Sequence, residues 1–347
     1  MSLADLCAAL IVLGLTAYAV LAGADFGAGL WDLAAGRGRR GARARTLIVS
    51  AMGPVWEANH VWLIFVLVVF WTCFPVAFGS VASTLAIPLF LAALGIIFRG
   101  STFAFRGSAG PRTRPLLRAL FALSSLLTPF FLGSAVGAVA SGRVPVGNAA
   151  GDPVASWWNP TGALTGALAA LTGVYLSAVY LAADARRADA PDLAEAFRLR
   201  ALLSGAVTGA VAIGGLLVLR EDARDFFDRL VSDGLGFVIL SAVAGVATLA
   251  LLWRRAYGPA RVASAIAVAA VIWGWAWSQR PEFLPGELAI DEAAAGRPTL
   301  VAVLVATAVG TLVLAPSLAY LFRLVLSGRL DKELPPLADA EKGGPVP

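Results

Sequence analysis

Long runs of apolar residues dominate the pattern along this chain. A helix needs about 20 mostly apolar residues to cross a hydrocarbon layer about 30 Å thick. The sequence holds nine such runs, each bounded by charges or by Pro and Gly. They cover residues 5–35, 47–71, 77–98, 115–140, 161–183, 200–219, 235–253, 260–278 and 299–322. This pattern predicts an all-α integral membrane protein with nine transmembrane helices.

The composition excludes most soluble classes of protein. Of the 347 residues, 59% are hydrophobic and only 14% are charged, whereas a soluble domain carries about 25% charged residues. The chain has two Cys, two Met and one His, which are too few ligands for several haems, a binuclear copper site or an iron–sulfur cluster. We therefore expect this chain to hold no metal and no redox cofactor of its own.

The basic residues gather on one side of the predicted membrane. If the amino terminus lies outside, 21 of the 27 Lys and Arg residues face the cytoplasm, in segments 36–46, 99–118, 184–200, 254–261 and 323–347. This asymmetry follows the positive-inside rule. It predicts a multi-pass protein of the cell membrane with its amino terminus outside and its carboxyl terminus in the cytoplasm. Because each basic run is short and lies between apolar spans, nucleic acid is not an expected partner.

A short internal similarity suggests how the spans are grouped. Residues 14–25 (GLTAYAVLAGAD) resemble residues 173–184 (GVYLSAVYLAAD) after a displacement of 159 positions. We expect a first four-helix half over 1–140, a second over 160–278, a peripheral ninth helix at 299–322 and a cytoplasmic tail at 323–347. Glycines four residues apart favour close helix packing in lipid, as at Gly23 and Gly27, Gly133 and Gly137, Gly162 and Gly166, and Gly205 and Gly209.

Once every other charge is assigned to a loop or a helix end, two acids, Asp25 and Glu57, remain inside the apolar runs. An acid at the bilayer centre costs about 2.5–3.5 kcal/mol, so such a residue is a functional candidate. Both acids lie 12 residues from an arginine of the first inner segment, Arg37 or Arg45, which places them roughly 18 Å from that segment in regular helices. We predict that they share one polar pocket or path. The alternative is that each is only capped at a helix break.

A polar face runs through the second span beside Glu57. Trp56, Glu57, Asn59 and His60 fall on one half of a helix at about 100° per residue. We predict that these four residues and Asp25 form a proton pathway. His60 is the single histidine, and both a polar partner of Glu57 and an axial haem ligand are open readings for it.

Two arginines stand among aromatic residues at the inner end of the third span. Arg99 and Arg106 lie in the string FRGSTFAFR at 98–106. We expect them at the membrane interface, in contact with lipid phosphate or with a neighbouring acidic group.

Three strings together resemble a known family. They are GADFGAG at 23–29, GPVWEANHVWLI at 53–64 and FRGSTFAFR at 98–106, and their order and spacing are similar to those of subunit II of cytochrome bd-type quinol oxidases. The resemblance implies a complex that oxidises membrane quinol and reduces dioxygen to water. It also implies that the haems belong to a partner, the haem-bearing subunit I.

The resemblance assigns this chain a helper role. It implies a non-haem subunit that stabilises the haem subunit and lines a proton path, with Asp25 as the acid of the first motif and Glu57 in the second. Quinol and membrane lipid are further expected partners, and a bound quinone or lipid is compatible with such a complex. Two other readings stay open from the residues alone, a secondary transporter and a structural membrane scaffold of a divergent complex.

Overall fold

The computed structural model describes residues 2–326 except 37, 53–55, 106–109 and 111, and it is almost entirely helical. The helices are α1 (Leu3–Leu33), α2 (Arg39–Met52), α3 (Trp56–Cys73), α4 (Pro75–Thr84), α5 (Ala86–Ala104), α6 (Arg114–Ala140), α7 (Pro160–Arg187), α8 (Pro191–Asp222), α9 (Arg224–Ser232), α10 (Leu235–Trp253), α11 (Tyr257–Gln279), α12 (Ile290–Ala293) and α13 (Arg297–Leu326). Two short strands, β1 (Glu282–Leu284) and β2 (Leu288–Ala289), pair as an antiparallel hairpin.

Eight helices are long and apolar enough to cross a membrane. These are α1, α5, α6, α7, α8, α10, α11 and α13. Each overlaps one of the nine predicted spans, so the all-helical, multi-span prediction is confirmed at this level. The remaining predicted span, 47–71, is divided between α2 and α3, and its apolar helical part is the shorter segment Asn59–Cys73. The count of nine spans and the orientation of the termini stay predictions.

The predicted span 77–98 is not one helix. The chain leaves helical geometry at Leu85, where ψ is 24°, so that α4 ends at Thr84 and α5 begins at Ala86. The physical reason is Pro88, which lacks an N–H and cannot donate to the carbonyl of Thr84 four residues earlier. The membrane-length helix is therefore α5 alone, extended to Ala104.

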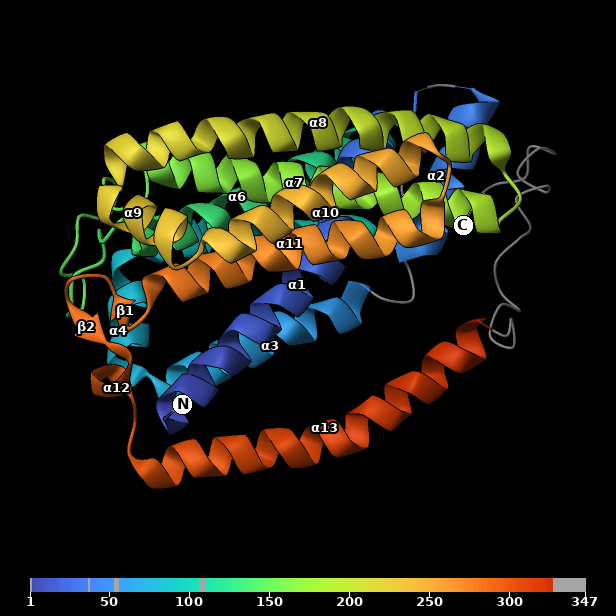
Figure 1. The fold of residues 1–347 in the computed structure, drawn as a ribbon. Coiled ribbons are helices and arrows are strands. Elements are labelled where there is room, and N and C mark those ends of the chain that lie inside the picture. The colour runs from blue at the N-terminus through green and yellow to red at the C-terminus, as the bar shows by residue number, and fades with distance from the viewer. Residues whose placement is uncertain (1, 37, 53–55, 106–109, 111, 327–347) are drawn as a thin grey trace.

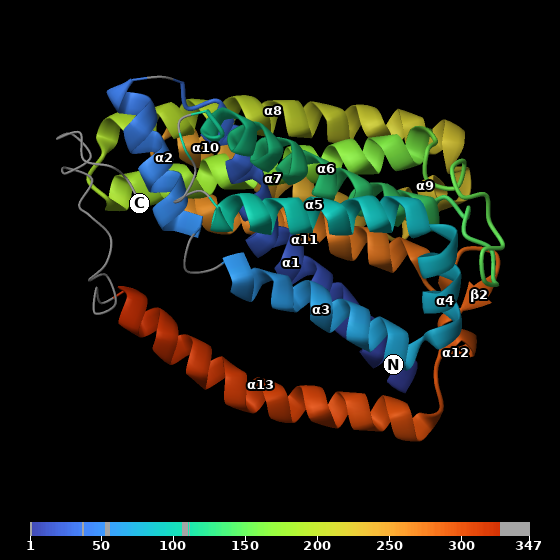
Figure 2. The ribbon, with the colours of Figure 1, turned by 180° about the vertical axis from the view of Figure 1, so that it is seen from behind.

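Helix α1 lies inside the bundle and contacts α3, α6, α7 and α11. Figures 1 and 2 show α6, α7 and α8 layered on one side of it, with α10 and α11 beside them. Helix α13 runs along the periphery, next to α1 and α3 and away from α8 in both views. This arrangement makes α1 the helix on which residues of several others converge.

Close glycine contacts join the central helices. A Cβ atom built on Gly133 of α6 would lie 2.6 Å from the carbonyl oxygen of Thr165, and one built on Gly166 of α7 would lie 2.7 Å from that of Phe130. The predicted close packing is confirmed at this pair of helices. On α8 only one glycine of the pair lies at a close contact, because a Cβ on Gly205 would lie 2.9 Å from the Tyr175 side chain, whereas one on Gly209 would meet nothing within 4 Å.

Polar contacts tie the helix ends at the side where α1 begins. Ser2 and Asp5 form a capping box at the start of α1, in which the Ser2 side chain accepts from the Asp5 N–H at 3.1 Å. The Asp5 carboxylate also pairs with Arg280 at 2.9 Å, and this ion pair joins the start of α1 to the segment before the β hairpin. Asp5 is therefore paired at the end of its helix, whereas Asp25 of the same helix is buried inside the bundle.

Candidate functional site

The site is built around Asp25, a carboxyl buried inside the bundle on α1. Its side chain is 9% exposed, and the Asn59 amide of α3, 4% exposed, donates a hydrogen bond to Oδ2 of Asp25. Thus α1 and α3 bring together an acid and an amide that the sequence placed on two different predicted spans. A hydrogen bond to a buried carboxyl offsets part of the cost of removing it from water.

Arg99 of α5 is the second polar neighbour of Asp25. Its Nη2 donates to the main-chain oxygen of Asp25 at 2.6 Å, and its Nη1 donates to the Ser125 hydroxyl of α6. The guanidinium carbon lies 4.9 Å from the ring centroid of Phe26 and 4.6 Å from that of Phe121. One side chain of α5 therefore links α1 and α6 through both hydrogen bonds and cation–π contacts.

Arg99 was expected to contact lipid phosphate or a neighbouring acidic group, and it contacts the main chain of an acidic residue, Asp25, inside the bundle. The side chain is only 2% exposed and points into the bundle. The reason is the face of α5 on which it lies, because Gly95 and Thr102, four residues before and three after, are buried on the same stripe. The charge is tolerated there because hydrogen-bond acceptors and aromatic faces replace water around it.

Three aromatic rings form a cluster next to Asp25. Tyr18, Phe26 and His60 meet edge to face, with centroid separations of 6.0–6.3 Å. His60 thus packs between two rings of α1. The two readings of His60, as a polar partner of Glu57 and as an axial haem ligand, both stay predictions.

Other predicted site residues lie outside what the structure describes. The helix α3 includes Trp56 and Glu57, but their side chains are outside the described part, as is Arg106. Whether Glu57 and Trp56 face Asp25 stays a prediction. Within the described residues, no group of three or more His, Cys, Asp or Glu side chains is placed to hold a metal ion.

Sequence reasoning missed several residues that form the site. Ser125, Phe121 and Tyr18 contact the candidate residues, and Asp32 near the end of α1 is a further buried carboxyl. One available signal was the run of hydroxyl residues Ser124, Ser125 and Thr128 within apolar α6, which is the face that meets α5. Tyr18 gave no such signal, since a tyrosine in a membrane span is common.

Replacing Arg99 by Lys is expected to lower the free energy of unfolding by about 2 kcal/mol, because an ammonium cannot reproduce a planar group that bonds two acceptors and stacks on two rings. The measurement is the thermal unfolding midpoint of the purified protein in detergent. The control is Arg112→Lys, an exposed arginine just before α6. Equal midpoints for the two variants would contradict the inward role of Arg99.

Comparison with known proteins places this geometry in context. The family described as cytochrome bd terminal oxidase subunit II matches residues 3–325. Among curated relatives, a putative cytochrome bd menaquinol oxidase subunit II of Bacillus subtilis (strain 168) is 24% identical over 238 residues, 66% of this chain and 67% of that protein. Cytochrome bd ubiquinol oxidase subunit 2 of the same organism is 29% identical over 133 residues, only 38% of each protein.

A solved structure agrees over nearly the whole chain. It belongs to the bd oxidase from Geobacillus thermodenitrificans, with a TM-score of 0.74 and 26% sequence identity. The superposition covers 94% of this chain and 99% of the other. The likeness therefore includes the second half of the chain, which contains none of the three sequence motifs.

Proposed function

Since the chain belongs to the cytochrome bd terminal oxidase subunit II family, and so is a subunit of an oxidoreductase complex, we propose that it is the non-haem subunit of a quinol:O2 oxidoreductase. In this role it stabilises a haem-bearing partner and carries protons toward the site where O2 is reduced to water. The proton-carrying part of the role rests on residues of this chain. The stabilising part rests on the membership of the family.

The observation that carries the proposal is the buried Asp25 with its two polar neighbours. An unassisted acid in a membrane span is costly, and here the Asn59 amide and the Arg99 guanidinium are both within bonding distance of the residue. Burial disfavours the carboxylate, whereas the nearby guanidinium favours it. A carboxyl under these opposed influences is suited to take up and release a proton.

The chemistry of each group follows from its contacts. Asp25 would hold the proton on its carboxyl, and the Asn59 amide, a donor to Oδ2, would orient that carboxyl toward a single direction of transfer. Arg99 donates to the main chain and to Ser125, so it positions the α1 backbone and supplies a fixed positive charge. Glu57, with Trp56 and His60, would continue the path from α3.

The proposed direction of transfer is from the basic side to the partner. Protons enter near the inner segments 36–46 and 99–118, pass Glu57 and Asp25, and leave sideways at the face that contacts the haem subunit. The haems of that subunit supply the electrons that reduce O2. No step in this proposal needs a haem held by this chain.

A tagged chain tests the complex itself. Purified from membranes in mild detergent, it is expected to bring with it a haem-bearing membrane subunit and quinol-dependent oxygen consumption. Isolation of the chain without any haem protein, from cells that express the partner, would contradict the assignment. Retention of a fully active, haem-loaded partner in cells that lack this chain would contradict the stabilising role and also the scaffold alternative.

A further inference from the structure

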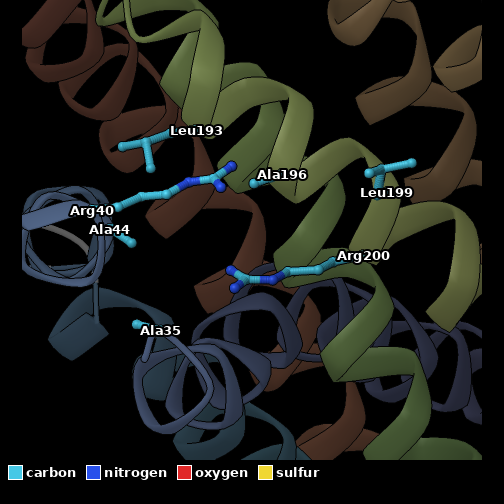
Figure 3. A pocket seen from close by; sticks show the side chains of 7 residues that line it. All are labelled: Ala35, Arg40, Ala44, Leu193, Ala196, Leu199 and Arg200. Atoms are coloured by element: carbon cyan, nitrogen blue, oxygen red, sulfur yellow. The ribbon is translucent and has the colours of Figure 1, made fainter. Parts of the chain in front are cut away.

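We propose that the ends of α1, α2 and α8 form a binding site for the phosphate of an anionic membrane phospholipid, held between Arg40 and Arg200. The site is a pocket of about 330 Å³, within the range of small ligand sites. Figure 3 shows both arginine side chains extending into the space between α2 and α8. It is separate from the Asp25 site and goes beyond the proposed function.

Neither arginine is neutralised by a carboxylate among the described residues. Arg40 donates to the main-chain oxygen of Asp192 at 3.2 Å, and Arg200 donates to that of Ala34 at 3.4 Å. The Asp192 carboxylate forms a bidentate ion pair with Arg43, at 3.0 and 3.1 Å. Two like charges thus share one pocket, and a bound anion would stabilise this arrangement.

The Arg200 guanidinium packs on two aromatic rings, and one of its nitrogens has no acceptor among the described residues. It lies over the rings of Trp31 and Phe197, with its central carbon 5.4 and 4.9 Å from their centroids. Its Nη1 is buried and makes no hydrogen bond within the described part of the chain. A buried donor without an acceptor is unfavourable, and a phosphate oxygen in the pocket would satisfy it in the geometry that guanidinium groups prefer.

The walls of the pocket favour a lipid over a soluble anion. Apart from the two arginines, the lining is apolar: Ala35, Ala44, Leu193, Ala196 and Leu199. Leu199 is 51% exposed on the outside of α8, so an apolar surface continues from the pocket along this helix. A free phosphate would gain nothing from these walls, whereas the acyl chains of a phospholipid would lie along them. Basic pockets between helices at a membrane surface are a known mode of lipid headgroup binding.

The test measures lipid binding to the purified complex and does not depend on its activity. Delipidated protein in neutral detergent is titrated with dioleoyl-phosphatidylglycerol, dioleoyl-phosphatidylcholine or inorganic phosphate, and bound lipid is counted by native mass spectrometry. We expect preferential binding of phosphatidylglycerol. In R40Q/R200Q this affinity should fall roughly 30-fold, if each arginine contributes about the usual amount for a basic residue at an anionic surface.

Matched variants keep the result interpretable. R254Q removes an exposed arginine at the end of α10, on the same side of the molecule, and should bind as the wild type does. R40Q alone alters an exposed residue and should reduce affinity about 5-fold with an unchanged unfolding midpoint. Wild-type affinity in R40Q/R200Q would overturn the site. Competition by millimolar inorganic phosphate as effective as that by phosphatidylglycerol would overturn the choice of a lipid.

Discussion

Asp25→Asn is expected to lower quinol-dependent oxygen consumption of the assembled complex about 100-fold, the low end of what loss of a proton-transferring group costs. The substitution keeps the size of the side chain, and its amide oxygen can still accept from Asn59 at the position of Oδ2. The new side chain cannot release a proton. Packing should therefore be retained while proton transfer is lost.

The measurements are oxygen consumption and proton uptake by the complex in proteoliposomes, together with the yield of haem-loaded complex. Unchanged rates of both processes in Asp25→Asn would remove the basis for a proton path through α1. A fall in haem content alone would instead assign Asp25 to assembly.

Asp152→Asn is the matched control for a change of charge. Asp152 is an exposed acid in the loop between α6 and α7. The main-chain N–H groups of Ala155 and Val154 donate to its carboxylate and hold its pKa below the ordinary value. It is therefore ionised at neutral pH and has no proton to relay, and its variant should consume oxygen at the wild-type rate.

Gly27→Ala is expected to cost roughly 3 kcal/mol of stability, the upper part of the range for overpacking a core. A Cβ at this position would lie 2.0 Å from the carbonyl oxygen of Gly173 and 2.7 Å from the Cα of Val174. Both atoms belong to the backbone of α7, so no side chain can turn away to make room. Helices α1 and α7 would have to separate.

The separation would reach the site, since Asp25 is only two residues from Gly27. It would also strain the hydrogen bond from the Trp31 indole to the carbonyl of Val174, 3.0 Å long. We expect a lower unfolding midpoint and a lower yield of complex, measured on the tagged protein in detergent.

Gly23→Ala provides the control on the same helix. One turn earlier than Gly27, a Cβ would meet only the Leu176 side chain, at 3.8 Å, which is an ordinary contact. This variant should keep the wild-type midpoint. Equal behaviour of the two alanine variants would show that the α1–α7 crossing tolerates separation.

Hydropathy was a sound guide wherever a span is one continuous helix. Runs such as 161–183 and 235–253 lie within α7 and α10, because an apolar stretch of that length has few alternatives to a helix in lipid. It was a poor guide at 77–98, which holds most of α4 and the first part of α5. A mean over a window does not register the one-residue break at Leu85, even though Pro88 indicates it.

The candidate site was predictable in part. The cost of a carboxyl in an apolar run identified Asp25, and helical periodicity grouped Asn59 with the polar face of its span. Nothing in that reasoning could show that Asn59 is the residue that bonds Asp25. The bond depends on the rotation of α3 about its own axis, which is set by the residues of other helices packed against it.

The amino-acid sequence by itself determined that the chain is a bundle of membrane-spanning helices and that an acid within a span, such as Asp25, is costly to bury. These properties follow from the transfer of each segment from water to lipid. Only the tertiary structure decided that Arg99 faces Asp25 and that Arg40 and Arg200 share a pocket. Such pairs come from helices far apart in the sequence, and which side chains meet depends on the packing of all helices together.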